Sequence, residues 1–142
     1  MGSVFKFRRR VEFPETDAAG FMHFSEYFRY MEATEHALLR SLGRSVFQRG
    51  EEGIVSFVRV HAECDFSRPL RFEEEVDVHL AVREVNEKSI VYDFKFHKLE
   101  SAADVARGSI TVVCILKRPD QDAVKAIEIP ADLAAVLKER LR

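Results

Sequence analysis

The sequence has few of the signals that mark metal sites, disulfide frameworks and phosphate-binding loops. Its 142 residues include two cysteines, and neither has a second cysteine or a histidine at the spacing of a metal site. We predict that Cys64 and Cys114 are buried thiols, and we expect neither a metal nor a cofactor. Glycine-rich phosphate loops, GxSxG nucleophile motifs and HExxH zinc motifs are also absent.

Long apolar runs and a strong charge of one sign are missing as well. No stretch approaches the ~20 apolar residues that a membrane-spanning helix needs, and the N-terminus has no signal-peptide core. The formal net charge is −2. Apart from the short run 8–10, there is no basic stripe with interleaved aromatic residues, so we expect no nucleic-acid partner. These absences favour a cytoplasmic protein without a membrane span.

Residues 13–43 carry the strongest pattern in the chain. A strand pattern ends at Pro14, a turn with Asp17 closes at Gly20, and a long helical pattern begins near Phe24. An acid in a tight turn before a helix can act in catalysis, because the free N–H groups of the first helical turn can hold a developing oxyanion. Asp17 is therefore a candidate catalytic residue, although aspartate is also a common turn former.

The helical pattern predicts one helix over residues 24–42, with Gly43 as its C-terminal stop. Its apolar stripe comprises Phe24, Tyr27, Phe28, Met31, Leu38, Leu39 and Leu42. Glu35 lies near the middle of this stripe. Because an unpaired buried charge is costly, we expect Glu35 to point toward the sheet and to pair with Arg59, His61 or a residue of a second subunit.

Five segments are predicted to form strands, mostly because apolar and polar residues alternate in them. They are residues 4–13, 54–66, 72–85, 89–99 and 106–117. In the second of these, the alternation places Val58 and Val60 on the face opposite Arg59 and His61. The last four are joined by short turns, which predicts antiparallel pairing. We expect the stretches 44–53 and 119–125 to be connections without strands, and a short helix to begin near Pro130.

Composition and element order together predict the fold class. Hydrophobic residues make up 46% and charged residues 32% of the chain, which is typical of a globular domain, and we expect one domain over residues 1–142. One long helix cannot cover a large flat sheet, so the sheet should curl around it. This α+β arrangement, a curled antiparallel sheet wrapped around one long helix, is the hotdog fold.

The segment 110–116 is apolar at almost every position. Such a segment is typical of a strand that is covered on both faces. Because the single long helix covers only one face of a sheet, we expect the protein to be at least a dimer.

The region before and within the predicted helix contains a spaced set of residues, namely Asp17, Gly20, the pair His23 and Phe24, Tyr27, and the run Tyr30, Met31 and Glu32. With this set the chain resembles the 4-hydroxybenzoyl-CoA thioesterase family of hotdog acyl-CoA thioesterases. Residues 65–72 and 127–130 are also similar to segments of that family, so the resemblance extends through most of the chain. One subgroup of the family has a histidine where this chain has Phe24, and His23 occupies the preceding position.

The resemblance implies an enzyme that hydrolyses an acyl-CoA thioester to a free acid and CoA, without a cofactor. It implies that Asp17 is the catalytic carboxylate, as nucleophile or as general base, and that a backbone amide near Phe24 is the oxyanion donor. Gly20, His23 and Tyr27 then belong to the oxyanion and substrate-binding site. The family also implies a homodimer or homotetramer whose active sites lie at subunit interfaces.

Several alternatives stay open at this point. Arg68 and Arg71 flank a break at Pro69 and could contact CoA phosphates, although an ordinary surface role fits them as well. His23 could cap the helix, and Tyr27 could be a core residue. The chain could also hydrolyse acyl carrier protein thioesters, which a basic patch at the pocket mouth would favour. If the chain were a non-catalytic acyl-binding protein, we would expect Asp17 to be buried and paired, with no open pocket beside it. A hydratase would need a paired histidine and acid, which the sequence does not offer.

Overall fold

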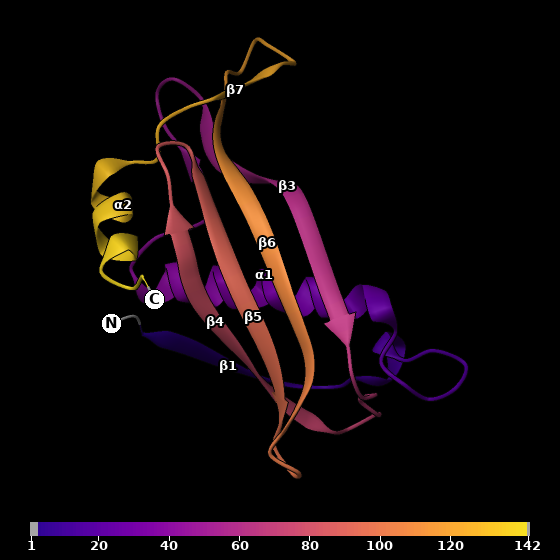
Figure 1. The fold of residues 1–142 in the computed structure, drawn as a ribbon. Coiled ribbons are helices and arrows are strands. Elements are labelled where there is room, and N and C mark those ends of the chain that lie inside the picture. Colours follow the sequence, from indigo (N-terminus) through magenta and orange to yellow (C-terminus); the bar gives the residue numbers. More distant parts are fainter. Residues whose placement is uncertain (1–2, 142) are drawn as a thin grey trace.

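A computed structural model describes residues 3–141, so residues 1, 2 and 142 of the predicted domain lie outside the described residues. Within this range an antiparallel sheet curls around one long helix (Figure 1). The strands are β1 (Val4–Arg10), β2 (Phe47–Arg49), β3 (Ile54–Phe66), β4 (Glu75–Val85), β5 (Ser89–Lys98), β6 (Ala103–Lys117) and β7 (Val124–Ala126). The helices are α1 (Phe24–Ser41) and α2 (Ala131–Lys138), and a single 3₁₀ turn spans Phe13–Glu15. The predicted hotdog architecture is confirmed.

The sheet order is β1-β4-β5-β6-β3-β2, with β7 paired to the end of β6. All neighbouring strands are antiparallel, as the short turns predict. The strands β2 and β7 lie in stretches that the sequence patterns indicate as connections. Each has only three residues, which is too short for an alternation to show, and each forms by pairing with one end of a long strand.

The helix α1 is held by its buried stripe against the concave face of the sheet. It ends where predicted, because Gly43 has φ +74°, a left-handed conformation that suits glycine after a helix. The middle of the stripe is fully buried and packs on apolar residues of β4, β5 and β6, with Tyr30, Met31, Leu38 and Leu39 on the helix side. The first turn differs from the expectation. Phe24 is 62% exposed, because the N-terminal end of α1 emerges beyond β3 (Figure 1).

A β-bulge in β3 overturns the predicted faces of that strand. The pairing with β6 shifts register between Arg59 and His61, so one extra residue is inserted there. Arg59 therefore faces α1 together with Ala62, whereas Val58 and Val60 are exposed at 38% and 59%. The predicted division, with both valines on one face and both Arg59 and His61 on the other, is wrong. The alternation of faces changes phase at the bulge, so Arg59 and His61 do not share a face.

The apolar segment of β6 is largely covered within one chain. Ile110, Val112 and Cys114 belong to the core, and Ile115 and Leu116 are also buried. This segment therefore gives less reason for a dimer than its sequence indicates. An open edge lies on β3 instead, since β2 pairs only with residues 54–56 and no other described strand borders residues 57–66 on that side. The dimer stays a prediction.

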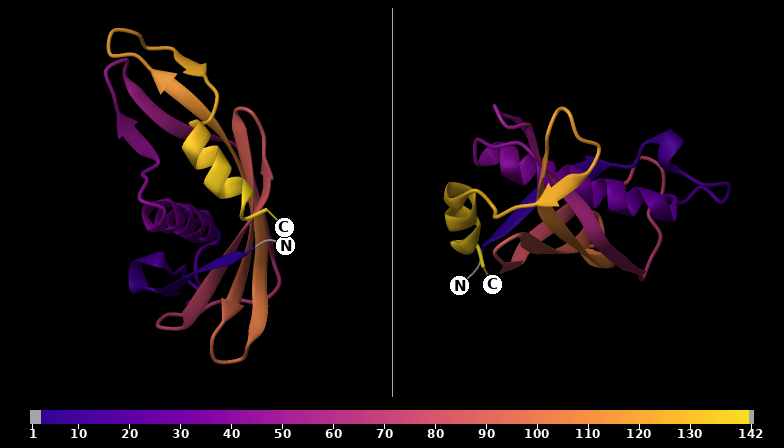
Figure 2. Two further views of the ribbon diagram at one scale, coloured as in Figure 1. Left: turned by 90° about the vertical axis from the view of Figure 1, so that its left-hand side faces the viewer. Right: turned by 90° about the horizontal axis from the view of Figure 1, so that it is seen from above.

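The second helix closes the end of the core where α1 stops, as the views in Figures 1 and 2 agree. Leu133 and Leu137 of α2 are buried in the core cluster, and the side chain of Asp132 pairs with Arg44, which follows α1. This leaves the opposite end, where α1 begins, uncovered by any second helix. In the described part of the chain, no helix is long and apolar enough to cross a membrane.

Candidate active site

The loop between β1 and α1 is a tight hairpin, and Asp17 stands at its start. The Oδ1 atom of Asp17 accepts hydrogen bonds from the N–H groups of Ala19 at 2.9 Å and Phe21 at 3.1 Å. The backbone N–H of Asp17 donates to the Phe21 carbonyl at 2.7 Å, and the Gly20 N–H donates to the Asp17 carbonyl at 3.0 Å. Gly20 has φ +85°, so the turn requires glycine there.

These contacts fix the orientation of the Asp17 carboxylate and leave half of it unused. Its Oδ2 atom accepts no hydrogen bond from the residues that the structure describes, and the residue is exposed. The turn-forming role of Asp17 is therefore real, but it occupies only one of the two carboxylate oxygens. The second oxygen is available to a substrate or to a water molecule.

A cavity of about 520 Å³ lies beside this loop. Five of the residues expected at the site line it, namely Asp17, His23, Phe24, Tyr27 and Arg68. They come from the loop, the first turn of α1 and the segment after β3, and the fold brings these three regions together. Phe66 also lines the cavity and was not expected there. Its alternation in β3 correctly indicates the face toward α1, but the sequence does not show that it lies opposite the first helical turn.

Gly20 and Arg71 do not line the cavity. Gly20 shapes the turn, whereas the guanidinium of Arg71 lies 5.1 Å from the ring centroid of Phe21. The backbones of Phe21 and Arg71 also form an isolated β-bridge. Arg71 thus holds the loop in place, and it is less well placed than Arg68 to contact a ligand in the cavity.

His23 begins the helix and also borders the cavity. Its Nδ1 accepts from the Ser25 N–H at 3.3 Å, which is the expected capping role, and its ring is tilted by 34° against the Phe24 ring with centroids 4.7 Å apart. The His23 N–H donates to the Glu15 carbonyl at 2.8 Å. The next amide, that of Phe24, has no acceptor among residues 3–141. A free N–H at a helix N-terminus is suited to bind a negatively charged oxygen.

Tyr27 forms the inner wall of the cavity. It is buried, and its ring contacts those of Phe66 and Phe96 at centroid distances of 4.9 and 5.2 Å. Burial raises the pKa of its hydroxyl to about 12, so Tyr27 stays neutral at physiological pH. It is a core residue that also presents one edge to the cavity.

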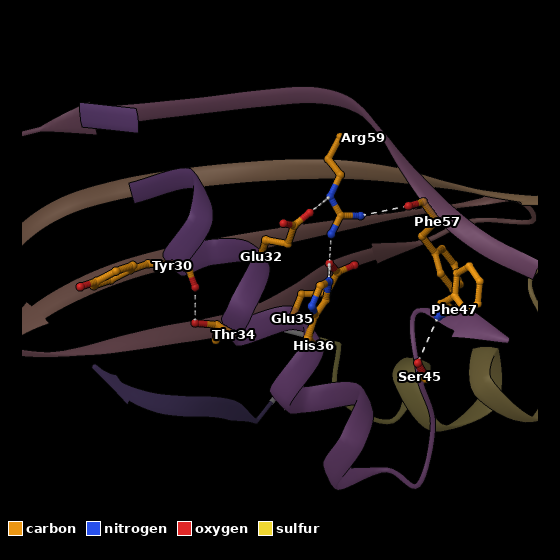
Figure 3. Close-up of polar contacts among 9 residues, drawn as sticks. All are labelled: Tyr30, Glu32, Thr34, Glu35, His36, Ser45, Phe47, Phe57 and Arg59. Atoms are coloured by element: carbon orange, nitrogen blue, oxygen red, sulfur yellow. Dashed lines mark hydrogen bonds and ion pairs between the residues drawn. The ribbon is translucent and has the colours of Figure 1, made fainter. Parts of the chain in front are cut away.

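A second acidic site lies farther along α1 (Figure 3). Glu35 is 2% exposed, and its Oε1 accepts a hydrogen bond from Nη2 of Arg59. The Nε of Arg59 is 3.1 Å from an oxygen of Glu32, and its Nη1 donates to the Phe57 carbonyl at 3.2 Å. The predicted burial and pairing of Glu35 are confirmed, with Arg59 as the partner. Burial raises the pKa of Glu35 to about 7, although the charge of Arg59 opposes this shift.

No metal centre is apparent in the part of the chain that the structure covers. Within residues 3–141, histidine, cysteine, aspartate and glutamate side chains form no group of three or more that could hold a metal ion. Cys114 is buried as predicted, whereas Cys64 is only half buried, and both are free thiols.

The family model of the thioesterase-like superfamily matches residues 11–137. The chain belongs to this superfamily. The predicted family and the predicted enzyme class, thioester hydrolase, are confirmed. The matched range includes the Asp17 loop, α1, β3 and most of α2, so it covers every residue that lines the cavity.

Three similar proteins illustrate the relationship. A protein of Aquifex aeolicus (strain VF5), provisionally named an esterase, is 33% identical over 95% of this chain and 98% of its own length. A 1,4-dihydroxy-2-naphthoyl-CoA hydrolase of Prochlorococcus marinus (strain NATL2A) is 34% identical, but the match spans 64% of this chain and 63% of that protein. The crystal structure of a 1,4-dihydroxy-2-naphthoyl-CoA thioesterase from Synechocystis superposes with TM-score 0.82 over 96% of this chain and 97% of that one. At 23% identity, this last similarity shows a shared fold.

Proposed function

We propose that this thioesterase-like protein hydrolyses a CoA thioester to a free acid and CoA at the cavity beside Asp17. One observation carries the proposal. The Oδ2 atom of Asp17 and the N–H of Phe24 have no hydrogen-bond partner among the described residues, and both residues line the same cavity. CoA as the carrier is supported by relatives whose names give CoA thioesters as substrates. The apolar walls formed by Phe24, Tyr27 and Phe66 suit an acyl group.

In the proposed reaction the thioester carbonyl oxygen points to the Phe24 N–H and the N-terminus of α1. Negative charge develops on that oxygen during attack, and the amide and the helix dipole stabilise it. The free Oδ2 of Asp17 either attacks the carbonyl carbon, giving an acyl-carboxylate anhydride that water cleaves, or removes a proton from an attacking water. In both routes the C–S bond breaks and CoA leaves as a thiolate that takes up a proton.

The other cavity residues have supporting roles in this proposal. His23 fixes the first turn of α1 through its contact with Ser25, so it orients the oxyanion donor. Arg68 lies at the border of the cavity and is exposed, where it can contact a CoA phosphate. Arg71 is the weaker candidate for a phosphate contact, because it does not line the cavity itself and packs against Phe21, which does.

The proposed assembly is a homodimer or homotetramer with the active site at a subunit interface. Two features of the structure support it. Residues 57–66 of β3 form an open edge next to the cavity, and the large apolar side chains around this edge are exposed, Phe24, Val60 and Phe66 among them. A second copy would bury them and narrow the cavity. Sedimentation at micromolar concentration should show a dimer or tetramer, and a single 16.4 kDa species would contradict this.

A panel of thioesters tests the proposed reaction. Short, long and aromatic acyl groups are presented on CoA and on acyl carrier protein, and the released thiol is measured. We expect turnover of at least one acyl-CoA well above the spontaneous rate. Faster turnover of the same acyl group on acyl carrier protein would reassign the carrier. A folded protein that binds acyl-CoA without releasing any thiol would support the non-catalytic alternative, although the exposed Asp17 beside a cavity already speaks against it.

A further inference from the structure

Behind the Asp17 loop, on the side away from the cavity, the carboxylate of Glu15 is held by three groups. Its Oε1 accepts a hydrogen bond from the Tyr30 hydroxyl at 2.6 Å and another from the Glu12 N–H at 2.8 Å. Its Oε2 lies 3.8 Å from Nη2 of Arg9. Only 16% of this side chain is exposed, and it does not line the cavity. A carboxylate with this much bonding is fixed in place.

Tyr30 is a rigid donor for this contact, because it is fully buried in the second turn of α1. The guanidinium of Arg9 lies 4.6 Å from its ring centroid, and the ring stacks on Phe96 at 6.5 Å. The hydroxyl lies also within 3.3 Å of the Arg10 carbonyl. Burial and the neighbouring Glu15 carboxylate raise the pKa of Tyr30 well above its ordinary value, so the hydroxyl keeps its proton.

Glu15 passes this constraint to both groups of the proposed active site. It lies two residues before Asp17, at the end of the 3₁₀ turn that leads into the hairpin. Its backbone carbonyl accepts the His23 N–H at 2.8 Å, directly before the free N–H of Phe24. A bridge between Thr16 and Met22 closes the hairpin between these points. Movement of Glu15 would therefore shift the carboxylate of Asp17 relative to the N–H of Phe24.

We infer that the contact between Tyr30 and Glu15 positions the Asp17 carboxylate against the Phe24 N–H, so that Glu15 and Tyr30 are positioning residues of this enzyme. The inference rests on the proposed function of Asp17. Neither residue touches the cavity, so their effect on the reaction passes through the loop. Small errors in such a geometry are expensive, since a 1 Å displacement of a reacting group can cost ~10²-fold in rate.

Tyr30→Phe removes the hydroxyl and keeps the buried ring. We expect kcat to fall by about tenfold, less than a full 1 Å displacement would cost, with little change in KM. The dissociation constant of a non-hydrolysable thioether analogue of the best acyl-CoA should stay the same, because the cavity walls are untouched. Glu15→Ala should reproduce the loss of kcat. Glu15→Gln should recover most of the activity, since its amide oxygen can accept from both Tyr30 and the Glu12 N–H.

Tyr92→Phe is the matched control. Tyr92 is a second buried tyrosine, and its hydroxyl has no hydrogen-bond partner among the described residues. The variant Tyr92→Phe should retain wild-type kcat, even if its Tm changes as much as that of Tyr30→Phe. A wild-type kcat in Tyr30→Phe would overturn the inference, as would a parallel loss of kcat and analogue binding, or a kcat of Glu15→Gln no higher than that of Glu15→Ala.

Asp17→Asn separates the two proposals: if it is inactive and Tyr30→Phe is unaffected, only the positioning role is wrong. If it is fully active, the role of Asp17 is wrong and the positioning role falls with it.

Discussion

Two carboxylates, one in the loop before α1 and one within it, are held in opposite ways. Asp17 precedes α1, is exposed, and is oriented by two backbone N–H groups of its own turn, which leave one oxygen free beside a cavity. Glu35 lies in the middle of α1, is buried, and is paired with the guanidinium of Arg59. The difference follows from the backbone. In a turn, backbone N–H groups are free to bind a carboxylate, as those of Ala19 and Phe21 do, whereas inside a helix every N–H is already bonded to a carbonyl.

The position of an acid along a helix therefore decides what it can do. An acid in the loop before a helix can stay in contact with solvent, as the exposed Asp17 does. An acid under the middle of the helix needs a cation from elsewhere, and here even Arg59 does not prevent a raised pKa for Glu35. We expect changes at Asp17 to alter the rate of hydrolysis and changes at Glu35 to alter the free energy of unfolding.

The largest expected effect is on the rate. Asp17→Asn should lower kcat by at least ~10²-fold, the lower range for loss of a general base, while Tm stays close to wild type. The amide oxygen can still accept from the N–H groups of Ala19 and Phe21, so the turn should survive. Hydrolysis and thermal unfolding are measured on the same preparation. Near-wild-type hydrolysis by the folded variant would show that Asp17 only forms the turn.

Next in size is the loss of the buried ion pair. Glu35→Ala should reduce the free energy of unfolding in urea by about 3 kcal/mol, the lower end of the range for breaking a buried pair. The lower end applies because Arg59 keeps its contacts with Glu32 and the Phe57 carbonyl. Glu32→Ala is the matched control. It removes the other carboxylate on Arg59, but that side chain is 48% exposed, so it should cost no more than ~1 kcal/mol. Equal losses in the two variants would remove the distinction between buried and exposed partners.

The pH dependence of stability sharpens the comparison further. The pKa of Glu35 is raised from 4.5 to about 7 in the folded protein, so between these values the folded state keeps a proton that the unfolded state has released. This group therefore stabilises the fold at pH 5, and its contribution is lost as pH rises through 7. The measured quantity is the free energy of unfolding of Glu35→Gln minus that of wild type. This difference should rise by about 2 kcal/mol from pH 5 to pH 7.

Burial lowers the pKa of the neighbouring His36 below its ordinary value, so its effect on stability has the opposite sign. It is present in both proteins, so most of its own contribution cancels in the difference between them. A constant difference between pH 5 and pH 7 would mean that Glu35 is ionised throughout this range.

The smallest effect concerns the exposed region around Asp17. Arg68→Ala should raise KM for acyl-CoA by roughly 2- to 5-fold with little change in kcat, since an exposed ion contact contributes at most ~1 kcal/mol. Arg71→Ala serves as the comparison, because Arg71 packs against Phe21 but does not line the cavity. It should change KM less. A larger effect of Arg71→Ala on KM would place the CoA phosphates on the other side of the loop.

Much of the fold could be predicted from local patterns. The helical stripe and Gly43 define α1 to within one residue. Alternation locates three of the four long strands after it, and a continuous apolar run locates the fourth. The face of Arg59 could not be predicted, because the bulge in β3 forms only against β6 and leaves no mark in the alternation itself. The strand β2 was not predicted for a similar reason, since it exists only through its pairing with β3.

The candidate site shows the same division. Asp17, His23 and Phe24 are close in sequence, so a single motif brings them forward together. Phe66 reaches the cavity only through the packing of β3 beside the start of α1, which depends on contacts between distant parts of the chain. The sequence does not point to Glu15, because its partner Tyr30 is 15 residues away in the chain and no local pattern indicates their contact.

The bulge in β3 has a further consequence for the solubility of the protein. A long, straight, unpaired strand edge is a template on which foreign strands can add, and repeated addition leads to fibrils. The register shift between Arg59 and His61 interrupts the edge near its middle, so an ordinary extended segment finds no continuous ladder there. Only a strand with a matching interruption could pair along its whole length. The bulge that places Arg59 on the face toward α1 thus also disfavours the addition of foreign strands at this edge.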